Sequence, residues 1–145
     1  MSHRIVKQTI PLFESYCRKK DIDGREISAK ISGVNVILKV ASTLESQEKG
    51  YMNSPEPPIS NRGIIFVYDD DQPLSFWMKN VNFPLDIIFF DSEMKYIDHK
   101  TMEPGHEVED HNLPQYHSKK PARFAVELQS GWCEKNMTPA CKLSF

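Results

Sequence analysis

The chain has 145 residues, 39% of them hydrophobic and 26% charged, which fits one globular domain with a packed core. Its formal net charge is −2, which argues against a general nucleic-acid-binding protein, because such a protein displaces counterions with a basic surface. The N-terminal residues contain no long apolar run, so we expect neither a signal peptide nor a membrane span, and a cytoplasmic location.

Helical and strand-like patterns alternate in the first third of the chain. Residues 10–20 predict a short amphipathic helix. Residues 26–41 alternate apolar and polar side chains, which predicts strand structure with a turn or bulge at Ser32-Gly33. A second short helix is predicted over residues 42–49.

The sequence marks both ends of this second helix. Ser42 and Glu45 stand at the spacing of a capping box, and Gly50 can end the helix. Beyond Gly50, short apolar segments separated by turn residues predict further strands. We expect strands over residues 63–68, 74–78, 85–90, 94–102, 123–128 and 141–145, turns at 69–73 and 91–93, a long polar loop over 103–121, and a short helix over 130–136.

Many short strands with few helices predict a mainly β (α+β) fold. We expect an antiparallel, barrel-like sheet with two or three short helices. Residues 74–78, 85–90 and 94–102 are expected to be consecutive strands of one meander. The strand over 85–90 is apolar on both faces, so it should be central and covered on both sides.

Asp86 is the unusual residue of this central strand. It falls on the face that Ile88 and Phe90 otherwise occupy, and a buried carboxylate requires a hydrogen-bond partner. The nearest candidates along the chain are Lys79, Asn80 and the backbone N–H groups that lead to Pro84.

Two interpretations of this segment compete. In the structural one, Asp86 accepts hydrogen bonds from the connection between the two strands and fixes a tight loop. In the functional one, Trp77, Lys79, Asn80 and Asp86 line the mouth of a pocket, roofed by the loop over residues 103–120. Trp offers a flat apolar surface, Lys a point charge and Asn both a donor and an acceptor, a set that suits a small anionic or polyhydroxylated ligand.

The same segment resembles a known family. Phe76-Trp77-Met78-Lys79-Asn80, followed by Pro84-Leu85-Asp86-Ile87-Ile88-Phe89, is similar to the signature of domain of unknown function 192. Further blocks resemble the family's other segments in the same order. These blocks are Ala41-Ser42-Thr43, Lys49-Gly50-Tyr51-Met52, Gly63-Ile64-Ile65-Phe66-Val67, Pro121-Ala122-Arg123-Phe124-Ala125-Val126-Glu127-Leu128 and Ser130-Gly131-Trp132.

The resemblance implies a compact, largely antiparallel, barrel-like fold and no established activity. It divides the chain into an N-terminal extension, residues 1–33, packed on a family-like domain, residues 34–145. Asn53 stands where the family's segment carries Arg, so an anion site that depends on this Arg is not expected here. The resemblance also implies that many relatives carry a leader for export, and we expect none in this chain.

Other chemistries find little support. The three cysteines are scattered and form no Cys-x-x-Cys pair, which favours a reducing compartment and argues against a zinc ribbon. No Gly-x-Ser-x-Gly nucleophile motif and no Gly-rich phosphate loop occur. Four histidines lie between residues 99 and 117, but their intervals match no compact zinc spacing, so we expect no metal and no cofactor. These histidines are His99, His106, His111 and His117.

Three functions remain in order of preference. The first is a small non-enzymatic ligand-binding or accessory module with its site at Trp77, Lys79, Asn80 and Asp86. The second is a hydrolase-like enzyme in which Asp86 acts as acid or base and Lys79 as its electrostatic partner. The third is a protein-interaction module that presents its N-terminal helix.

Overall fold

The computed structural model describes residues 19–138 and 141–145. The helix predicted over residues 10–20 lies almost entirely outside these residues, as does Cys17. The helical elements are α2 (Lys19–Ile22), α3 (Leu44–Lys49), the 3₁₀ turn η2 (Asp110–Asn112) and α4 (Trp132–Asn136). The strands are β1 (Glu26–Ile31), β2 (Val34–Ala41), β3 (Arg62–Gln72), β4 (Ser75–Phe76), β5 (Leu85–Phe90), β6 (Tyr96–Met102), β7 (Tyr116–His117), β8 (Ala122–Gln129) and β9 (Leu143–Ser144).

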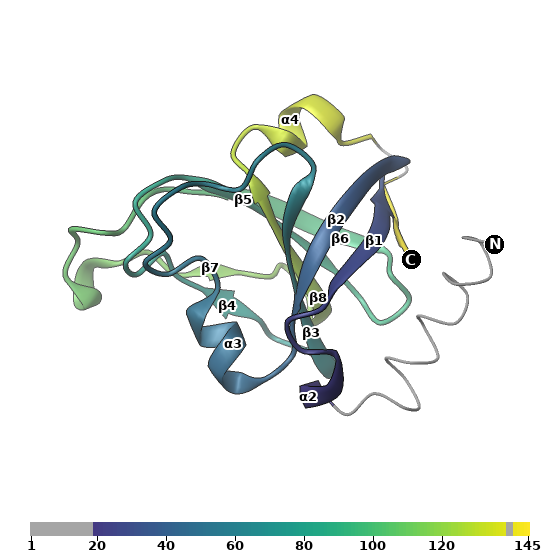
Figure 1. Cartoon of the computed structure of the whole chain (residues 1–145), viewed down its shortest axis with the longest axis horizontal. Helices are drawn as coiled ribbons and strands as arrows, with labels where there is room; N and C mark the ends of the chain where they lie inside the picture. Colours follow the sequence, from purple (N-terminus) through teal and green to yellow (C-terminus); the bar gives the residue numbers. More distant parts are fainter. Residues whose placement is uncertain (1–18, 139–140) are drawn as a thin grey trace.

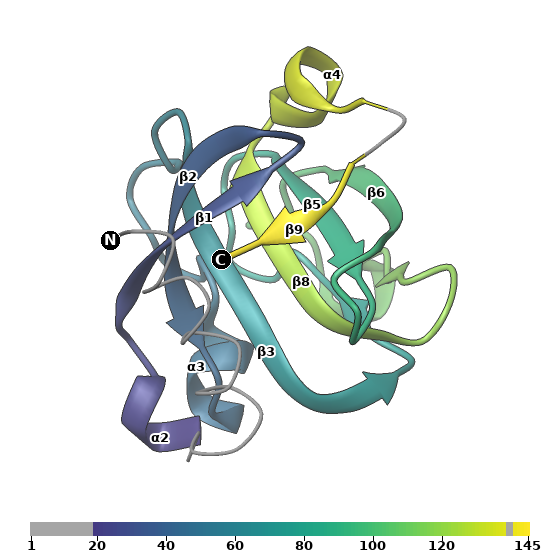
Figure 2. The ribbon, with the colours of Figure 1, turned by 90° about the vertical axis from the view of Figure 1, so that its right-hand side faces the viewer.

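Seven strands form one strongly curled sheet in the order β6-β5-β8-β3-β2-β1-β9 (Figure 2). Its pairs are antiparallel except β2 with β3, which are parallel and connected through α3. The two ends of the sheet approach each other where Leu143 donates its N–H to the Met94 carbonyl at 3.1 Å and Lys95 bridges Lys142. The predicted barrel-like, mainly antiparallel fold with short helices is confirmed. The parallel pairing of β2 with β3 was not predicted.

Apolar side chains cover the central strands on both faces. One buried cluster lies on the face covered by β1, β9 and α4, and includes Ile88, Phe90 and Val126. A second cluster lies on the opposite face and includes Leu85, Ile87 and Phe89. Every residue of β5 is buried, so the prediction of a central strand covered twice is confirmed. In Figure 1, α3, β4 and β7 lie at the opposite end of the molecule from α4.

The predicted turn at residues 69–73 is wrong. Strand β3 continues through this acidic run to Gln72, with a shift in its pairing with β8 between Val67 and Gln72. The extended run is possible because its carboxylates face solvent. In addition, Asp71 accepts hydrogen bonds from the N–H of Ser92 at 2.8 Å and from its hydroxyl at 2.9 Å.

The predicted three-stranded meander is also wrong. Strand β4 covers only Ser75–Phe76 and pairs with β7 in a separate two-stranded sheet, leaving β5 and β6 as a hairpin. The chain leaves the strand after Phe76 because the Val81 N–H bonds back to the Met78 carbonyl at 3.1 Å, and Asn80 takes a left-handed φ of 57°. This turn ends the first strand, so β4 and β5 belong to different sheets.

Candidate functional site

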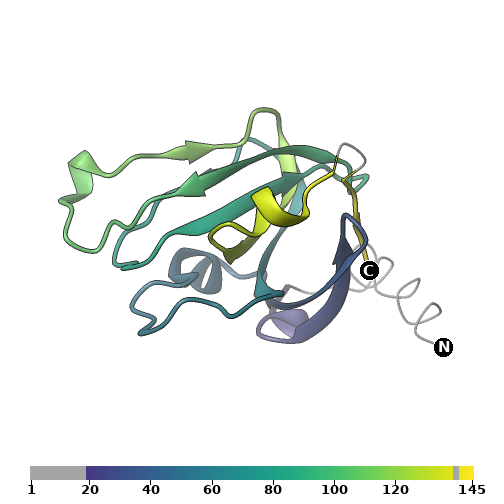
Figure 3. The same ribbon diagram turned by 90° about the horizontal axis from the view of Figure 1, so that it is seen from above.

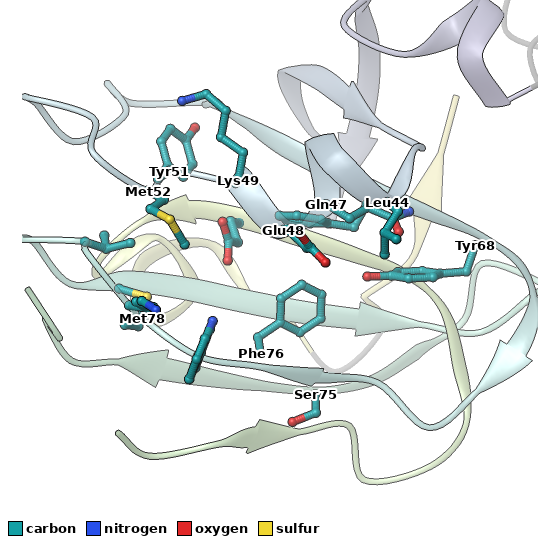
Figure 4. Close-up of a pocket in the computed structure, with 16 residues that line it drawn as sticks. Leu44, Gln47, Glu48, Lys49, Tyr51, Met52, Tyr68, Ser75, Phe76 and Met78 are labelled. Atoms are coloured by element: carbon teal, nitrogen blue, oxygen red, sulfur yellow. The ribbon is translucent and has the colours of Figure 1, made fainter. Parts of the chain in front are cut away.

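A pocket of about 280 Å³ opens between α3 and the sheet, near the lower end of the range of roughly 300–1,000 Å³ for small-molecule sites. Five aromatic rings form much of its wall. Its lining residues are Leu44, Gln47, Glu48, Lys49, Gly50, Tyr51, Met52, Phe66, Tyr68, Ser75, Phe76, Trp77, Met78, Lys79, Val81 and Glu127. Figure 4 shows the ring of Phe76 projecting into this space, opposite α3.

Polar contacts hold α3 over the pocket. Thr43 and Ser46 form a reciprocal capping box, one residue later than the predicted Ser42 pair, and Gly50 ends the helix as predicted. Asp23 accepts hydrogen bonds from the Ser42 N–H at 2.8 Å and the Ser46 hydroxyl at 2.6 Å. The cap shifts because Asp23 engages the Ser42 backbone, which leaves the Thr43 hydroxyl to cap.

Gln47 fastens the same helix to the sheet. Its Nε2 donates to the Val67 carbonyl at 2.9 Å and to the Ala41 carbonyl at 3.3 Å. These bonds fix the helix face that carries Glu48 above the pocket. The helix is thus a fixed wall of the pocket, held from three neighbouring segments.

Glu127 is the chemically unusual residue of the pocket. It lies in the middle of β8, paired with Ile64 of β3 on one side and Ile87 of β5 on the other, and it is only 4% exposed. Among the described residues, no donor reaches its Oε1 atom, which is buried. A Cβ added to Gly50 would lie 3.6 Å from this oxygen, so the glycine leaves room in front of the carboxyl group.

Burial raises the pKa of Glu127 from 4.5 to about 8, so the side chain is mainly a neutral acid at pH 7. Burial, together with the Glu127 charge, also raises the pKa of Tyr51 and of Tyr68, which stay protonated phenols at neutral pH. The pocket therefore combines an apolar aromatic wall with a carboxyl group whose charge can change near physiological pH.

Trp77 and Lys79, two of the four candidate site residues, both line this pocket. The Trp77 side chain is 38% exposed, and the Lys79 Nζ atom lies 5.4 Å from the centroid of its ring. Lys79 also forms an ion pair with Asp110, at 2.9 Å between Nζ and Oδ2. The positive charge of Lys79 is thus already engaged by an aromatic face and a carboxylate.

Asn80 and Asp86 are not among the described residues that line the pocket. Asn80 has a structural contact instead: its carbonyl accepts the Asn53 N–H at 2.8 Å, which ties the segment after α3 to the segment before β5. The four predicted site residues therefore do not converge, and only Trp77 and Lys79 share the pocket.

Asp86 is 1% exposed, on the other face of the sheet, where its partners differ from the predicted ones. It accepts hydrogen bonds from the Thr101 hydroxyl at 2.8 Å and from the Cys133 N–H at 2.9 Å. The expectation that it fixes the connection after Lys79 is wrong; it fixes the start of α4, where the N-cap Gly131 supplies no side-chain bond. Asp86 is thus a structural hydrogen-bond acceptor, as one of the two interpretations expected, but it holds the start of α4 and not the loop after β4.

The predicted roof over the pocket is wrong as well. No residue of the 103–120 segment is among the described residues that line the pocket; α3 and the turn after it cover the pocket instead. Strand β7 of this segment pairs with β4, and Gly105 bridges Lys79, so the segment lies along the outer side of the β4 chain. Figure 3 shows it extending beyond the sheet as a long arm.

Comparison with known proteins identifies the chain. Residues 27–144 match the sequence model of an uncharacterised family, domain of unknown function 192. The chain belongs to this family. The match begins inside β1, so it covers the first strand of the sheet as well as the segments quoted above.

Solved structures share the fold of this family member. A protein from Sinorhizobium meliloti 1021, provisionally named a transcription regulator, superposes with a TM-score of 0.73 at 21% identity, over 84% of this chain and 95% of that one. A protein of unknown function from Novosphingobium aromaticivorans superposes with a TM-score of 0.67 at 21% identity, over 83% and 85%. No curated protein matches the chain. At this identity the neighbours support the fold alone.

Metal and thiol chemistry find no centre in residues 19–138 and 141–145. No group of three or more His, Cys, Asp and Glu side chains in this part of the chain could hold a metal ion. Cys133 is buried, and burial together with the nearby Asp86 raises the pKa of its thiol, the opposite of what a nucleophilic cysteine needs. None of the helices in the same residues is long and apolar enough to cross a membrane.

Sequence reasoning missed Glu127. The signal was present: Glu127 is the acidic residue of an otherwise apolar run from Phe124 to Leu128, the same pattern that singled out Asp86. The alternation along β8 sets Glu127 and Ala125 on one face, opposite Phe124 and Val126, but which face borders a cavity depends on the packing of α3.

Proposed function

We propose that this protein is a small-ligand-binding module whose site is the pocket between α3 and the sheet. The observation that carries the proposal is the buried Oε1 atom of Glu127, which lies at this pocket without a hydrogen-bond partner among the described residues. Buried polar atoms are nearly always satisfied in folded proteins, and a ligand bound in this pocket would supply the missing partner.

The walls of the pocket support this role. Aromatic rings provide area for apolar contact, and Trp77 is a large side chain left partly exposed beside the pocket. The alternative, a hydrolase-like enzyme with an Asp86–Lys79 pair, loses its geometric basis because Asp86 is covered and bonded on the far face of the sheet. Of the two ligand classes expected from sequence, an anion is disfavoured wherever Glu127 is ionised, above its pKa of about 8.

We also propose a cytoplasmic location, which the state of the two buried cysteines supports. Cys133 and Cys141 are both free thiols in the structure, and thiols persist in reducing compartments.

A fragment screen against the ¹⁵N-labelled protein tests the location of the site. We expect hits to shift the amide signals of α3 and β4, and Trp77→Ala to weaken their binding by about tenfold, because one aromatic anchor contributes roughly 1–2 kcal/mol. Lys79→Ala is expected to change affinity less, because Lys79 already pairs with Asp110.

Matched variants elsewhere serve as controls. Tyr96→Ala removes an aromatic residue of similar exposure on β6, and Lys100→Ala removes a lysine paired with Asp98 at 2.7 Å. Both controls should leave binding unchanged. Hits whose affinities are unaffected by both Trp77→Ala and Lys79→Ala would overturn this location.

A further inference from the structure

We propose that the pocket takes an organic cation, an amine or quaternary ammonium group on an apolar body, whose charge pairs with the carboxylate of Glu127. The inference rests on the proposed function and names the class of ligand. Its starting point is geometric: a carboxyl group 4% exposed, with an oxygen that has no partner among the described residues, stands at a cavity that five aromatic rings line.

Aromatic rings and a buried carboxyl group are the two elements that recognise organic cations in proteins. The rings of Tyr51, Phe66, Tyr68, Phe76 and Trp77 line the cavity. The negative faces of such rings attract a cation, with an energy of ~2 kcal/mol or more when the cation is desolvated. A buried carboxylate needs hydrogen-bond donors or a positive charge beside it, and a ligand ammonium group would supply that charge to Glu127.

Two of the side chains that could hydrogen-bond a polyhydroxylated ligand, Gln47 and Ser75, are already engaged. The Gln47 amide nitrogen donates to two backbone carbonyls, and the Ser75 hydroxyl donates to the Gln115 side chain at 2.9 Å. Besides aromatic surface, the wall still offers a ligand two phenols, the carboxyl groups of Glu48 and Glu127 and the Lys49 side chain. The aromatic surface beside the buried carboxyl group favours a cation over a sugar or polyol.

The charges around the pocket point the same way. The titratable or charged residues that face it are Glu48 and Lys49 from α3, Tyr51 from the following turn, Tyr68 from β3 and Lys79 from the segment after β4. Lys79 is paired with Asp110, and in Figure 4 the Lys49 side chain extends away from Phe76. The neighbours of Glu127 on β3 and β5, Ile64 and Ile87, carry no charge.

Binding of a cation should therefore be linked to loss of a proton. The acid holds its proton at pH 7, with a pKa of about 8, and the bound ammonium group requires the ionised form. Each cation bound at pH 7 should thus release nearly one proton. Affinity should rise close to tenfold per pH unit between pH 6 and 7.5 and level off above pH 8.

Isothermal titration calorimetry with four six-carbon probes tests this inference. The probes are hexylammonium, hexyltrimethylammonium, 1-hexanol and hexanoate, each titrated at pH 7 in two buffers of different ionisation enthalpy, which reports the protons released. We expect one or both cations to bind at least tenfold more tightly than 1-hexanol and hexanoate. Glu127→Gln, a neutral isostere, should abolish proton release and remove at least tenfold of the cation affinity.

The outcomes separate the inference from the proposed function. If 1-hexanol or hexanoate binds more tightly than both cations and shifts the α3 and β4 signals, the ligand class is wrong and the site stands. Proton release that persists in Glu127→Gln also overturns the inference. If no probe shifts these signals at millimolar concentration, both the inference and the site fail. Glu48 is an exposed carboxyl group of the same pocket. The variant Glu48→Gln should therefore retain the proton release, and it serves as the matched control.

Discussion

Raising the pH from 5 to 8 is expected to lower the free energy of unfolding by about 3 kcal/mol through Glu127 alone. The pKa of this group is about 8 in the folded protein and 4.5 as an ordinary carboxyl group. Between these values the folded state keeps a proton that the unfolded chain has released, so stability is highest at the acidic end and is lost as the pH rises. Above pH 8 both states are ionised, and the loss levels off.

Glu127→Gln should remove this pH dependence, because an amide stays neutral throughout. Urea unfolding of both proteins at pH 5, 6, 7 and 8 gives the difference directly, since all other titrating groups contribute equally to each. Glu48→Gln should keep the wild-type slope, because Glu48 is exposed. Equal slopes for wild type and Glu127→Gln would show that the buried carboxyl group has an ordinary pKa.

Asp86→Ala is expected to lower the free energy of unfolding by about 3 kcal/mol or more. The change removes the acceptor of two hydrogen bonds, from the Thr101 hydroxyl and from the Cys133 N–H. Cys133 is buried, so its amide would have no replacement partner, and the first turn of α4 would lose its anchor to the sheet. Chemical unfolding at pH 7 measures the loss.

Two milder variants show which bond matters. Asp86→Asn preserves the shape and one acceptor oxygen, so about half of the loss is expected. Thr101→Val removes the hydroxyl from a residue that is exposed overall, and about 1 kcal/mol is expected. If Asp86→Ala unfolds within 1 kcal/mol of wild type, Asp86 does not anchor α4, and a role in chemistry or binding must be considered for it again.

Local patterns were sufficient to predict most of the fold. Alternation of apolar residues located the β1–β2 hairpin, and the double-faced apolar run located β5 with its bounds, Leu85–Phe90. The partners of short strands could not be predicted in the same way. Strand β4 is two residues long, and its pairing with β7 depends on the path of the loop between residues 103 and 115.

The candidate site was only half visible in the sequence for a related reason. Trp77 and Lys79 are polar or amphipathic residues next to an apolar run, a local signal that the structure places at the pocket. Asp86 and Glu127 carry the same local signal as each other, a carboxylate within a buried strand. They differ in what packs on their faces: α4 supplies an N–H to Asp86, and α3 leaves a cavity at Glu127. That difference depends on packing between segments that are distant in the sequence, so no local sequence pattern predicts it.

The proposed site depends above all on the raised pKa of Glu127. This pKa can be measured by following the ¹³Cδ resonance of Glu127 across pH 5 to 10, in the free protein and in the presence of saturating hexylammonium. We predict a pKa of about 8 in the free protein and a fall of at least one unit with the cation bound. A pKa near 4.5 in the free protein would contradict the account, because the carboxyl group would then be solvated or paired, and the pocket would have no unsatisfied group for a ligand to complete.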